Sequence, residues 1–204
     1  GDVYAGYLAK KLGLPINKLI VATNQNDILH RAISKGKYET EHVSETISPS
    51  MDIQIASNFE RLIYDLNNHD SSQTLDDMKN IKQNGKYTID DDKLKKINQD
   101  FLSARMSEQE TLDVIKNIYE KFNMVLDPHT AIGYGAFDKH DLKGNNIVLA
   151  TAHPCKFPDA ILKAINLKSD LPDELKFILD EKENYGIIEN NLKEIKQYIL
   201  GKIK

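Results

Sequence analysis

The sequence has little of what marks a secreted, membrane or nucleic-acid-binding protein. Its single cysteine, Cys155, cannot form an internal disulfide, and no apolar run reaches the roughly 18 residues of a membrane helix. The net charge is −4, and the basic residues are interspersed with acidic ones, so no surface for nucleic acid is indicated. We therefore expect a cytoplasmic protein with neither a membrane nor a nucleic-acid partner.

Several common chemical motifs are also absent. The chain has no Walker loop, no Gly-x-Gly-x-x-Gly, no pair of cysteines, and no two histidines at the spacing of a metal-binding helix. We therefore expect no metal site. An initiator methionine and a signal peptide are missing too, and the chain begins at Gly1 as if inside a longer sequence. This start predicts a fragment of a longer protein.

The 204 residues are 40% hydrophobic and 28% charged, which suits one or two globular domains with a sizeable core. Residues 146–157 read Asn-Ile-Val-Leu-Ala-Thr-Ala-His-Pro-Cys-Lys-Phe, an apolar run that ends in polar side chains. The run predicts a buried parallel strand, with Thr151 at the carboxyl edge where open α/β sheets bind ligands. In the alternative interpretation, Thr151 or His153 caps a helix that starts at a proline.

Two further segments repeat this architecture. Residues 18–23 form a strand pattern, followed by the polar run Asn24-Gln-Asn-Asp at the start of a short helix over 28–35. Residues 124–126 form a third strand candidate, followed by the small residues of 127–136. This alternation predicts an α/β fold with a parallel sheet, although Asn and Asp at such positions are also ordinary turn and cap residues.

Residues 69–121 differ in character, since they are rich in Lys, Asp and Asn with apolar residues at helical spacing, such as Leu94, Ile97 and Phe101. The pattern predicts a mostly helical insertion that stands apart from the sheet, with its charges in solvent. Before it, Ile55 and Phe59 open an apolar stripe that we expect in the core. We divide the chain into residues 1–71 and 123–166 for the sheet-bearing part, 72–122 for the insertion, and 167–204 for a helical tail.

Specific residues are more informative than these periodicities. Six stretches closely resemble threonine synthase and occur in the same order as in that family: 1–7, 20–31, 48–54, 57–61, 127–131 and 151–157. They include Ala-Thr-Asn-Gln-Asn-Asp-Ile-Leu, Ser-Pro-Ser-Met-Asp, Asp-Pro-His-Thr-Ala and Thr-Ala-His-Pro-Cys-Lys-Phe. The resemblance runs from residue 1 to the C-terminal region and covers only the later part of that enzyme.

The resemblance implies part of the large domain of a fold type II pyridoxal-phosphate enzyme, with a mostly parallel sheet, flanking helices and a helical insertion. The enzymes of this family are carbon–oxygen lyases acting on phosphates, and they convert O-phospho-L-homoserine and water into L-threonine and phosphate. The implied chemistry is removal of the α and β protons, γ-elimination of phosphate, and addition of water at the β-carbon. The cofactor pyridoxal 5'-phosphate is the electron sink, and the implied partner is the missing N-terminal part.

The resemblance also assigns cofactor-binding residues. Gly1 and Asp2 match the last two positions of the family's Gly-Asn-Phe-Gly-Asp loop, which binds the cofactor phosphate through backbone N–H groups. A glycine lets the backbone approach an anion closely, and the start of the following helix offers N–H donors and a favourable dipole. Thr151 matches the hydroxyl that bonds the pyridine nitrogen, and a neutral hydroxyl there does not force that nitrogen to be protonated. The Schiff-base lysine lies upstream, so we expect no catalytic lysine here and an inactive fragment.

Other assignments stay open. His153, Lys156 and Arg61 are hypotheses for binding the substrate's phosphate or carboxylate, and their alternative is a surface charge or a helix cap. Another fold type II lyase, such as a dehydratase, would share the sheet and the phosphate loop. The fragment alone could also be a non-catalytic binding or interaction module, because it lacks the lysine.

Overall fold

A computed structural model describes residues 2–203, and the chain divides between Ser169 and Asp170 into two units, which we describe separately. The first unit contains, in order, α1 (Asp2–Lys11), β1 (Leu19–Thr23), α2 (Ile28–Lys35), β2 (Lys37–Glu39), η1 (Pro49–Met51), α3 (Phe59–Leu66), α4 (Ser71–Asn84), β3 (Lys86–Thr88), α5 (Asp91–Asp100), β4 (Phe101–Arg105), α6 (Glu108–Phe122), α7 (Pro128–Asp138), η2 (Pro154–Lys156) and α8 (Pro158–Ile165). Gly1 lies outside the described residues.

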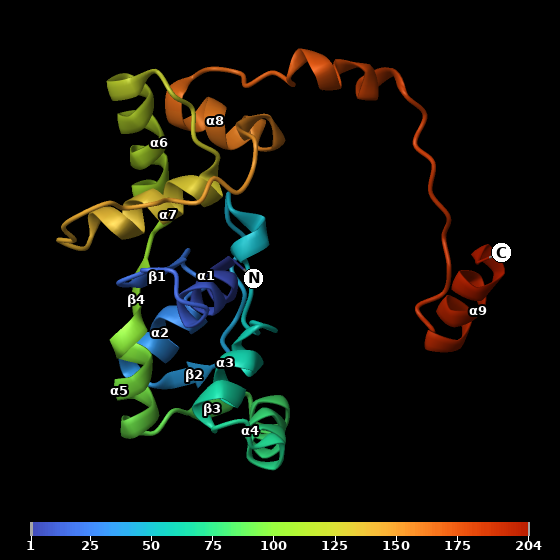
Figure 1. Cartoon of the computed structure of the whole chain (residues 1–204). Helices are drawn as coiled ribbons and strands as arrows, with labels where there is room; N and C mark the ends of the chain where they lie inside the picture. Colours follow the sequence, from blue (N-terminus) through green and yellow to red (C-terminus); the bar gives the residue numbers. More distant parts are fainter. Residues whose placement is uncertain (1, 204) are drawn as a thin grey trace. The chain divides into compact units, whose positions relative to one another are not determined.

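A parallel pair of strands is the centre of the first unit. β1 and β4 pair in register, with Leu19 opposite Phe101 and Thr23 opposite Arg105. α7 lies on one side of this pair and α2 on the other (Figure 1). The predicted strand over 18–23 and the helix over 28–35 are therefore confirmed, and β2 and β3 add a small antiparallel pair.

The larger apolar core lies beneath the strand pair. Val21 and Phe101 from the strands meet Ile28 of α2 and Ile97 of α5, and all four are buried. Each such side chain contributes about 1.5–3 kcal/mol through removal of its surface from water. A smaller cluster around Ile115 joins α6, α7 and α8. Residues up to Phe101 therefore share one core, and the later helices share a second.

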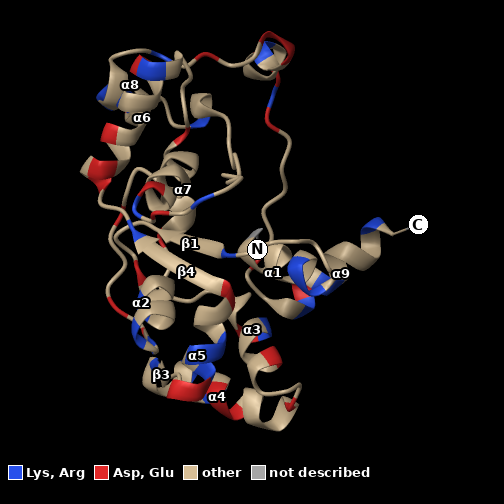
Figure 2. Ribbon diagram, turned by 60° about the vertical axis from the view of Figure 1, so that its left-hand side comes forward, with Lys and Arg blue, Asp and Glu red and all other residues tan. Residues whose placement is uncertain are grey.

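The prediction for residues 72–121 is only partly right. α4, α5 and α6 make the segment mostly helical, and charges of both signs alternate over α4 and α5 (Figure 2). The expectation that it stands apart from the sheet is wrong, because β4 lies within it and pairs with β1. Phe101 continues the helical spacing of Leu94 and Ile97, yet its backbone is extended, with φ −112° and ψ 143°. Burial against β1 determines this conformation, which local periodicity did not predict.

Two predicted strands do not form. Residues 124–126 and 147–151 are irregular, so the prediction that Thr151 ends a strand is wrong. Ile147 is 87% exposed and Leu149 57% exposed. The part of the chain that the structure describes places no strand beside residues 146–151, and an extended segment without a ladder partner gains neither hydrogen bonds nor burial. Ile55, expected in the core, is also exposed.

The second unit contains η3 (Asp173–Asp180) and α9 (Leu192–Lys202). α9 begins at Asn191, whose side-chain oxygen accepts hydrogen bonds from the backbone N–H groups of Lys193 and Glu194. Large apolar side chains such as Phe177 and Leu192 are exposed here. None of the helices among residues 2–203 combines the length and the apolar character needed to cross a membrane.

Candidate functional site

The first polar group of the candidate site lies where β1 ends. The side chains of Asn24 and Asn26 both donate to Asp52 Oδ1, at 2.7 and 2.9 Å. Thr46 donates to the same oxygen through its hydroxyl at 2.7 Å, and its backbone N–H reaches Asp52 Oδ2 at 2.9 Å. Asn24 and Asn26 are almost fully buried. One carboxylate therefore fastens the loop before α3 to the carboxyl end of the sheet.

A second polar group lies at the start of α7. Asp127 is 1% exposed and caps the helix, accepting from the backbone N–H groups of His129 and Thr130 at 2.9 and 3.3 Å. Its Oδ2 also accepts the hydroxyl of Thr130. Burial raises the pKa of Asp127, but hydrogen bonds from His129 and Thr130 outweigh that effect and hold the pKa below its ordinary value. This buried carboxylate is therefore ionised at neutral pH.

His129 connects the two groups. Its Nδ1 lies 3.2 Å from Asp127 Oδ1, and its Nε2 accepts the backbone N–H of Ser50 at 3.3 Å. Since an ionised carboxylate only accepts, Nδ1 carries the proton and Nε2 carries the lone pair. The ring packs against Phe157, with ring centroids 4.8 Å apart. Both ring nitrogens of His129 therefore have partners, and the side chain holds η1 against α7.

Thr151 lies at the open end of this second group. Its backbone N–H donates to Thr130 Oγ1 at 3.1 Å, and its own Oγ1 lies 3.4 Å from the same atom. The residue is exposed although Thr130 is buried. An accessible hydroxyl with an anchored backbone is suited to donating to, or accepting from, a ring nitrogen of a bound ligand. These donors and acceptors fit the pyridine nitrogen of pyridoxal phosphate.

The remaining predicted site residues are scattered. Asp2 is the first residue of α1, and the first N–H groups of any helix lack a partner within the helix, which suits them to binding an anion. Arg61, on α3, lies over the Tyr4 ring at 5.8 Å. His153 caps η2 by accepting the N–H of Cys155 at 3.2 Å, and Lys156 is exposed at the end of the same short helix. The predicted cofactor-sized gap between Gly1-Asp2 and Thr151 stays a prediction.

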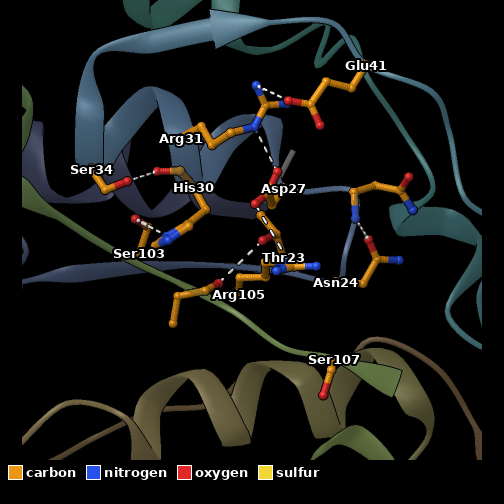
Figure 3. Close-up of polar contacts among 12 residues, drawn as sticks. Thr23, Asn24, Asp27, His30, Arg31, Ser34, Glu41, Ser103, Arg105 and Ser107 are labelled. Carbon is orange, nitrogen blue, oxygen red and sulfur yellow. Dashed lines mark hydrogen bonds and ion pairs between the residues drawn. The ribbon is translucent and has the colours of Figure 1, made fainter. Parts of the chain in front are cut away.

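A cavity of about 430 Å³ opens beside the end of β4. His30 Nδ1 lies 2.9 Å from Ser103 Oγ there (Figure 3). Burial lowers the pKa of His30, as do the nearby cations, although Asp27 opposes the shift. The cations lining the cavity face carboxylates, since Lys139 Nζ lies 2.7 Å from Glu110 and Arg105 Nε 3.7 Å from Asp27. The positive charges of Lys139 and Arg105 at this cavity are therefore paired with carboxylates.

Sequence reasoning missed the roles of Asp52, Asp127 and Thr130. A signal for the second group was present, because an Asp followed by Pro is a typical N-cap with proline at the first helical position. No local signal could identify Asp52, since its partners Asn24 and Asn26 precede it by 28 and 26 residues. Within residues 2–203, no three His, Cys, Asp or Glu side chains are grouped so that they could hold a metal ion.

Known proteins match this chain over almost its whole length. The family model described as threonine synthase, C-terminal, matches residues 130–199. A threonine synthase from Pseudomonas aeruginosa is 38% identical over 202 residues, which are 98% of this chain and 43% of that protein. The chain therefore spans less than half the length of such relatives.

Solved structures agree. The PLP-bound threonine synthase from Brucella melitensis is 42% identical with a TM-score of 0.88, over 97% of this chain and 43% of that one. Threonine synthase from yeast is 39% identical with a TM-score of 0.83, over 98% of this chain and 44% of that one. Both confirm the fold class, part of the large domain of a fold type II enzyme. The resemblance in the sequence is thus confirmed, and over nearly its whole length this chain matches the C-terminal part of threonine synthases.

Proposed function

We propose that this chain is the C-terminal part of an enzyme that converts O-phospho-L-homoserine and water into L-threonine and phosphate, using pyridoxal phosphate. The accessible hydroxyl of Thr151 carries the proposal, because the resemblance matches it to the family's ring-nitrogen partner and its backbone is anchored to Thr130. Similarity over almost the whole chain to threonine synthases, one of them solved with PLP bound, supports it. The protein is then a carbon–oxygen lyase acting on phosphates.

Each residue of this chain has a limited task in the proposed reaction. When bound, pyridoxal phosphate supplies an electron sink for the removal of substrate protons. Thr151 would orient the ring through its hydroxyl, and the N–H groups at the start of α1, with Gly1 and Asp2, would bind the phosphate group. Proton transfer at the substrate belongs to the lysine that the resemblance places upstream. His153, Lys156 and Arg61 stay hypotheses for substrate binding.

The full-length protein tests the reaction directly. We expect phosphate and threonine to form in equal amounts from O-phospho-L-homoserine, with little turnover of threonine or serine. Thr151→Val keeps the side-chain shape and removes the hydroxyl, so it should weaken the ring contact by roughly 0.5–1.5 kcal/mol and lower turnover more than stability. Thr151→Ser is the matched control and should retain most of the activity. Faster turnover of threonine or serine would favour a dehydratase instead.

The fragment by itself provides a separate test. We expect the 204-residue chain to form no specific lysine adduct with pyridoxal phosphate, because the matched lysine lies upstream. Borohydride reduction followed by peptide mass mapping would detect such an adduct. A single stoichiometric adduct on one of the chain's own lysines, together with threonine production, would contradict both the assignment and the expected inactivity. Weak labelling spread over surface lysines would contradict neither the assignment nor the expected inactivity.

A further inference from the structure

The cavity of about 430 Å³ lies at the carboxyl end of the parallel strand pair and has no part in the proposed function. The last three residues of β4, from Ser103 to Arg105, form one of its walls. The chain passes from β1 into α2 on one side of the pair, and from β4 into α6, which packs with α7 on the other side (Figure 1). Neighbouring parallel strands that feed helices on opposite sides leave a crevice at their carboxyl ends, where open α/β sheets bind ligands.

Two imidazole rings line this cavity, and each has a nitrogen without a protein partner. His140 Nε2 is buried, and no hydrogen bond reaches it within residues 2–203. His30 turns its Nδ1 toward Ser103 Oγ at 2.9 Å (Figure 3), whereas its Nε2 makes no hydrogen bond to the same part of the chain. A buried ring nitrogen without a partner is costly, so a polar group that enters the cavity would stabilise it.

Arg105 adds a positive charge that is only loosely held. Its Nε lies 3.7 Å from Asp27 Oδ2, which is longer than a hydrogen bond, and its side chain is 51% exposed. Asp27 is held more closely by Arg31, whose Nε donates to Asp27 Oδ1 at 2.8 Å. The guanidinium of Arg105 therefore keeps its N–H donors for another acceptor.

The other charges at the cavity are already satisfied. Lys139 Nζ donates to Glu110 Oε1 and to the backbone oxygen of Arg105, both at 2.7 Å. Glu110 Oε2 accepts from the backbone N–H and the hydroxyl of Ser107. Both oxygens of Glu110 thus have partners, and a cationic ligand would have to displace them. With Arg105 and Lys139 against Glu110, the lining carries one net positive charge, which favours an anion.

We propose that this cavity binds a small organic anion, a carboxylate or a phosphate ester, between Arg105, His30 and His140. The planar guanidinium of Arg105 matches the spacing of two oxygens on such a group. Each imidazole donates to the anion when its Nε2 carries a proton. The volume lies within the range of about 300–1,000 Å³ that small-molecule sites occupy. The site is separate from the proposed cofactor site, since it shares no residue with it.

The proposal couples anion binding to the protonation of His30. The charged and titratable groups around its ring are Asp27 and Lys35 from the two ends of α2, Arg105 of β4, Glu110 of α6, and Lys139 and His140 beyond α7. Burial lowers the pKa of His30, Asp27 opposes that shift, and the three neighbouring cations add to it. A bound anion places a negative charge beside the ring and therefore raises this pKa. By linkage, the anion binds more tightly as the pH falls through the pKa of His30.

The test follows the two rings directly, in full-length protein that is dialysed to remove unbound cofactor and labelled with ¹³C at the histidine Cε1 positions. His30→Gln and His140→Gln identify the two NMR signals. Succinate and inorganic phosphate are added separately, with sodium chloride keeping the ionic strength constant. We expect both signals to follow one saturable curve with a common Kd, and His30 to titrate at higher pH when the anion is bound. The probe that binds more tightly identifies a carboxylate or a phosphate as the recognised group.

Substitutions of Arg105 test the anion contact. Arg105→Gln removes the charge and should weaken binding of the probe about tenfold or more. Arg105→Lys keeps the charge without the planar fork of donors and should bind with intermediate affinity. Lys116→Gln is the matched control, because it removes one positive charge from the exposed surface of α6, where Lys116 lies 3.9 Å from Glu120. It should leave the affinity within about twofold.

Three outcomes overturn the inference. Signals of His30 and His140 that stay still, or move without saturating, mean that the cavity holds water alone. Saturation with different midpoints means that the two rings share no ligand. Equal affinity in wild type and Arg105→Gln, with helices retained by circular dichroism, removes the anion contact; if Arg105→Gln loses its helices, equal affinity in Arg105→Lys and wild type decides in the same way. None of these measurements uses phosphohomoserine turnover, so failure of the proposed function would be seen separately.

Discussion

Residues 19–23 and residues 147–151 look alike in sequence, yet only the first segment is a strand. Both are short runs of apolar residues that end in threonine. β1 pairs with β4 and buries Val21 in the main core, whereas Ile147 and Leu149 point into solvent. Both threonines nevertheless make hydrogen bonds, since Thr23 donates to Ala104 O and the Thr151 backbone donates to Thr130. A hydrogen bond thus fixes the end of each segment, while its strand character depends on pairing with another strand.

The difference shows that an apolar run indicates a segment that tends to be buried, but does not identify the segment that will cover it. β4 reaches β1 across about 80 residues, and this pairing removes both strands from water. The described residues supply no such partner for 147–151. We expect the part of the full-length protein outside this chain to cover Ile147 and Leu149, since the relatives are more than twice as long.

Matched isoleucine substitutions should produce the largest contrast between the two regions. Ile97, packed beneath the strand pair, is 1% exposed, so Ile97→Ala should lower the free energy of unfolding by about 2–5 kcal/mol. Ile147→Ala in the same 204-residue chain should change it by about 0.5 kcal/mol or less. Urea denaturation of both variants measures this. In the full-length protein the cost of Ile147→Ala should increase, and an equal cost in both proteins would argue against a covering partner.

The start of α7 should give an intermediate effect. Asp127→Ala removes a cap and leaves several donors unpaired, so we expect a loss of about 1–3 kcal/mol at neutral pH. The pKa of Asp127 is lowered on folding, so its contribution is fully present above the ordinary carboxyl pKa of about 4 and is lost as pH falls further. The stability difference between wild type and Asp127→Ala should therefore be smaller at pH 3 than at pH 7. A difference of the same size at both pH values would contradict an ionised Asp127.

Local signals predicted the helices well, because caps and turns act within a few residues. The helix over 28–35 was predicted in this way, and the Ser107 and Glu110 capping box of α6 and the Asp127-Pro start of α7 are further local signals of the same kind. The pairing of β4 with β1 and the convergence of Asn24 and Asn26 on Asp52 could not be read in this way. Both depend on segments far apart in the chain, whose contacts are decided by tertiary packing.

The candidate site also contains residues that could be predicted from the sequence and residues that could not. Thr151 was predicted from the resemblance, and its position beside Thr130 makes its proposed role physically reasonable. The supporting carboxylate Asp127 is the first residue of a quoted motif, but its burial and its link to Thr151 through Thr130 needed the structure. Gly1, which matches the phosphate loop, lies outside the described residues, so that half of the predicted site remains a prediction.

The smallest effect should come from Lys139, which follows α7, forms an ion pair with Glu110 of α6 and also donates to the end of β4. Lys139 Nζ donates to Glu110 at 2.7 Å and to Arg105 O at 2.7 Å, and together with hydrogen bonds from Ser107 it lowers the pKa of Glu110 to about 2. Lys139→Met should raise that pKa toward its ordinary value, which NMR titration of Glu110 would detect. Because both side chains are partly exposed, solvent screens the pair, and the loss of stability at pH 7 should be less than about 1 kcal/mol.

The sign of that effect follows from the depressed pKa. The pair contributes above the ordinary carboxyl pKa and loses its contribution as pH falls toward about 2, so wild type and Lys139→Met should become equally stable in strong acid. Lys116→Met is the matched control, since Lys116 lies 3.9 Å from Glu120 on the exposed surface of α6 and should leave the Glu110 titration unchanged. A loss of several kcal/mol in Lys139→Met would mean that the end of β4 depends on α7 as much as on β1, and that the strand pair is less self-sufficient than its core suggests.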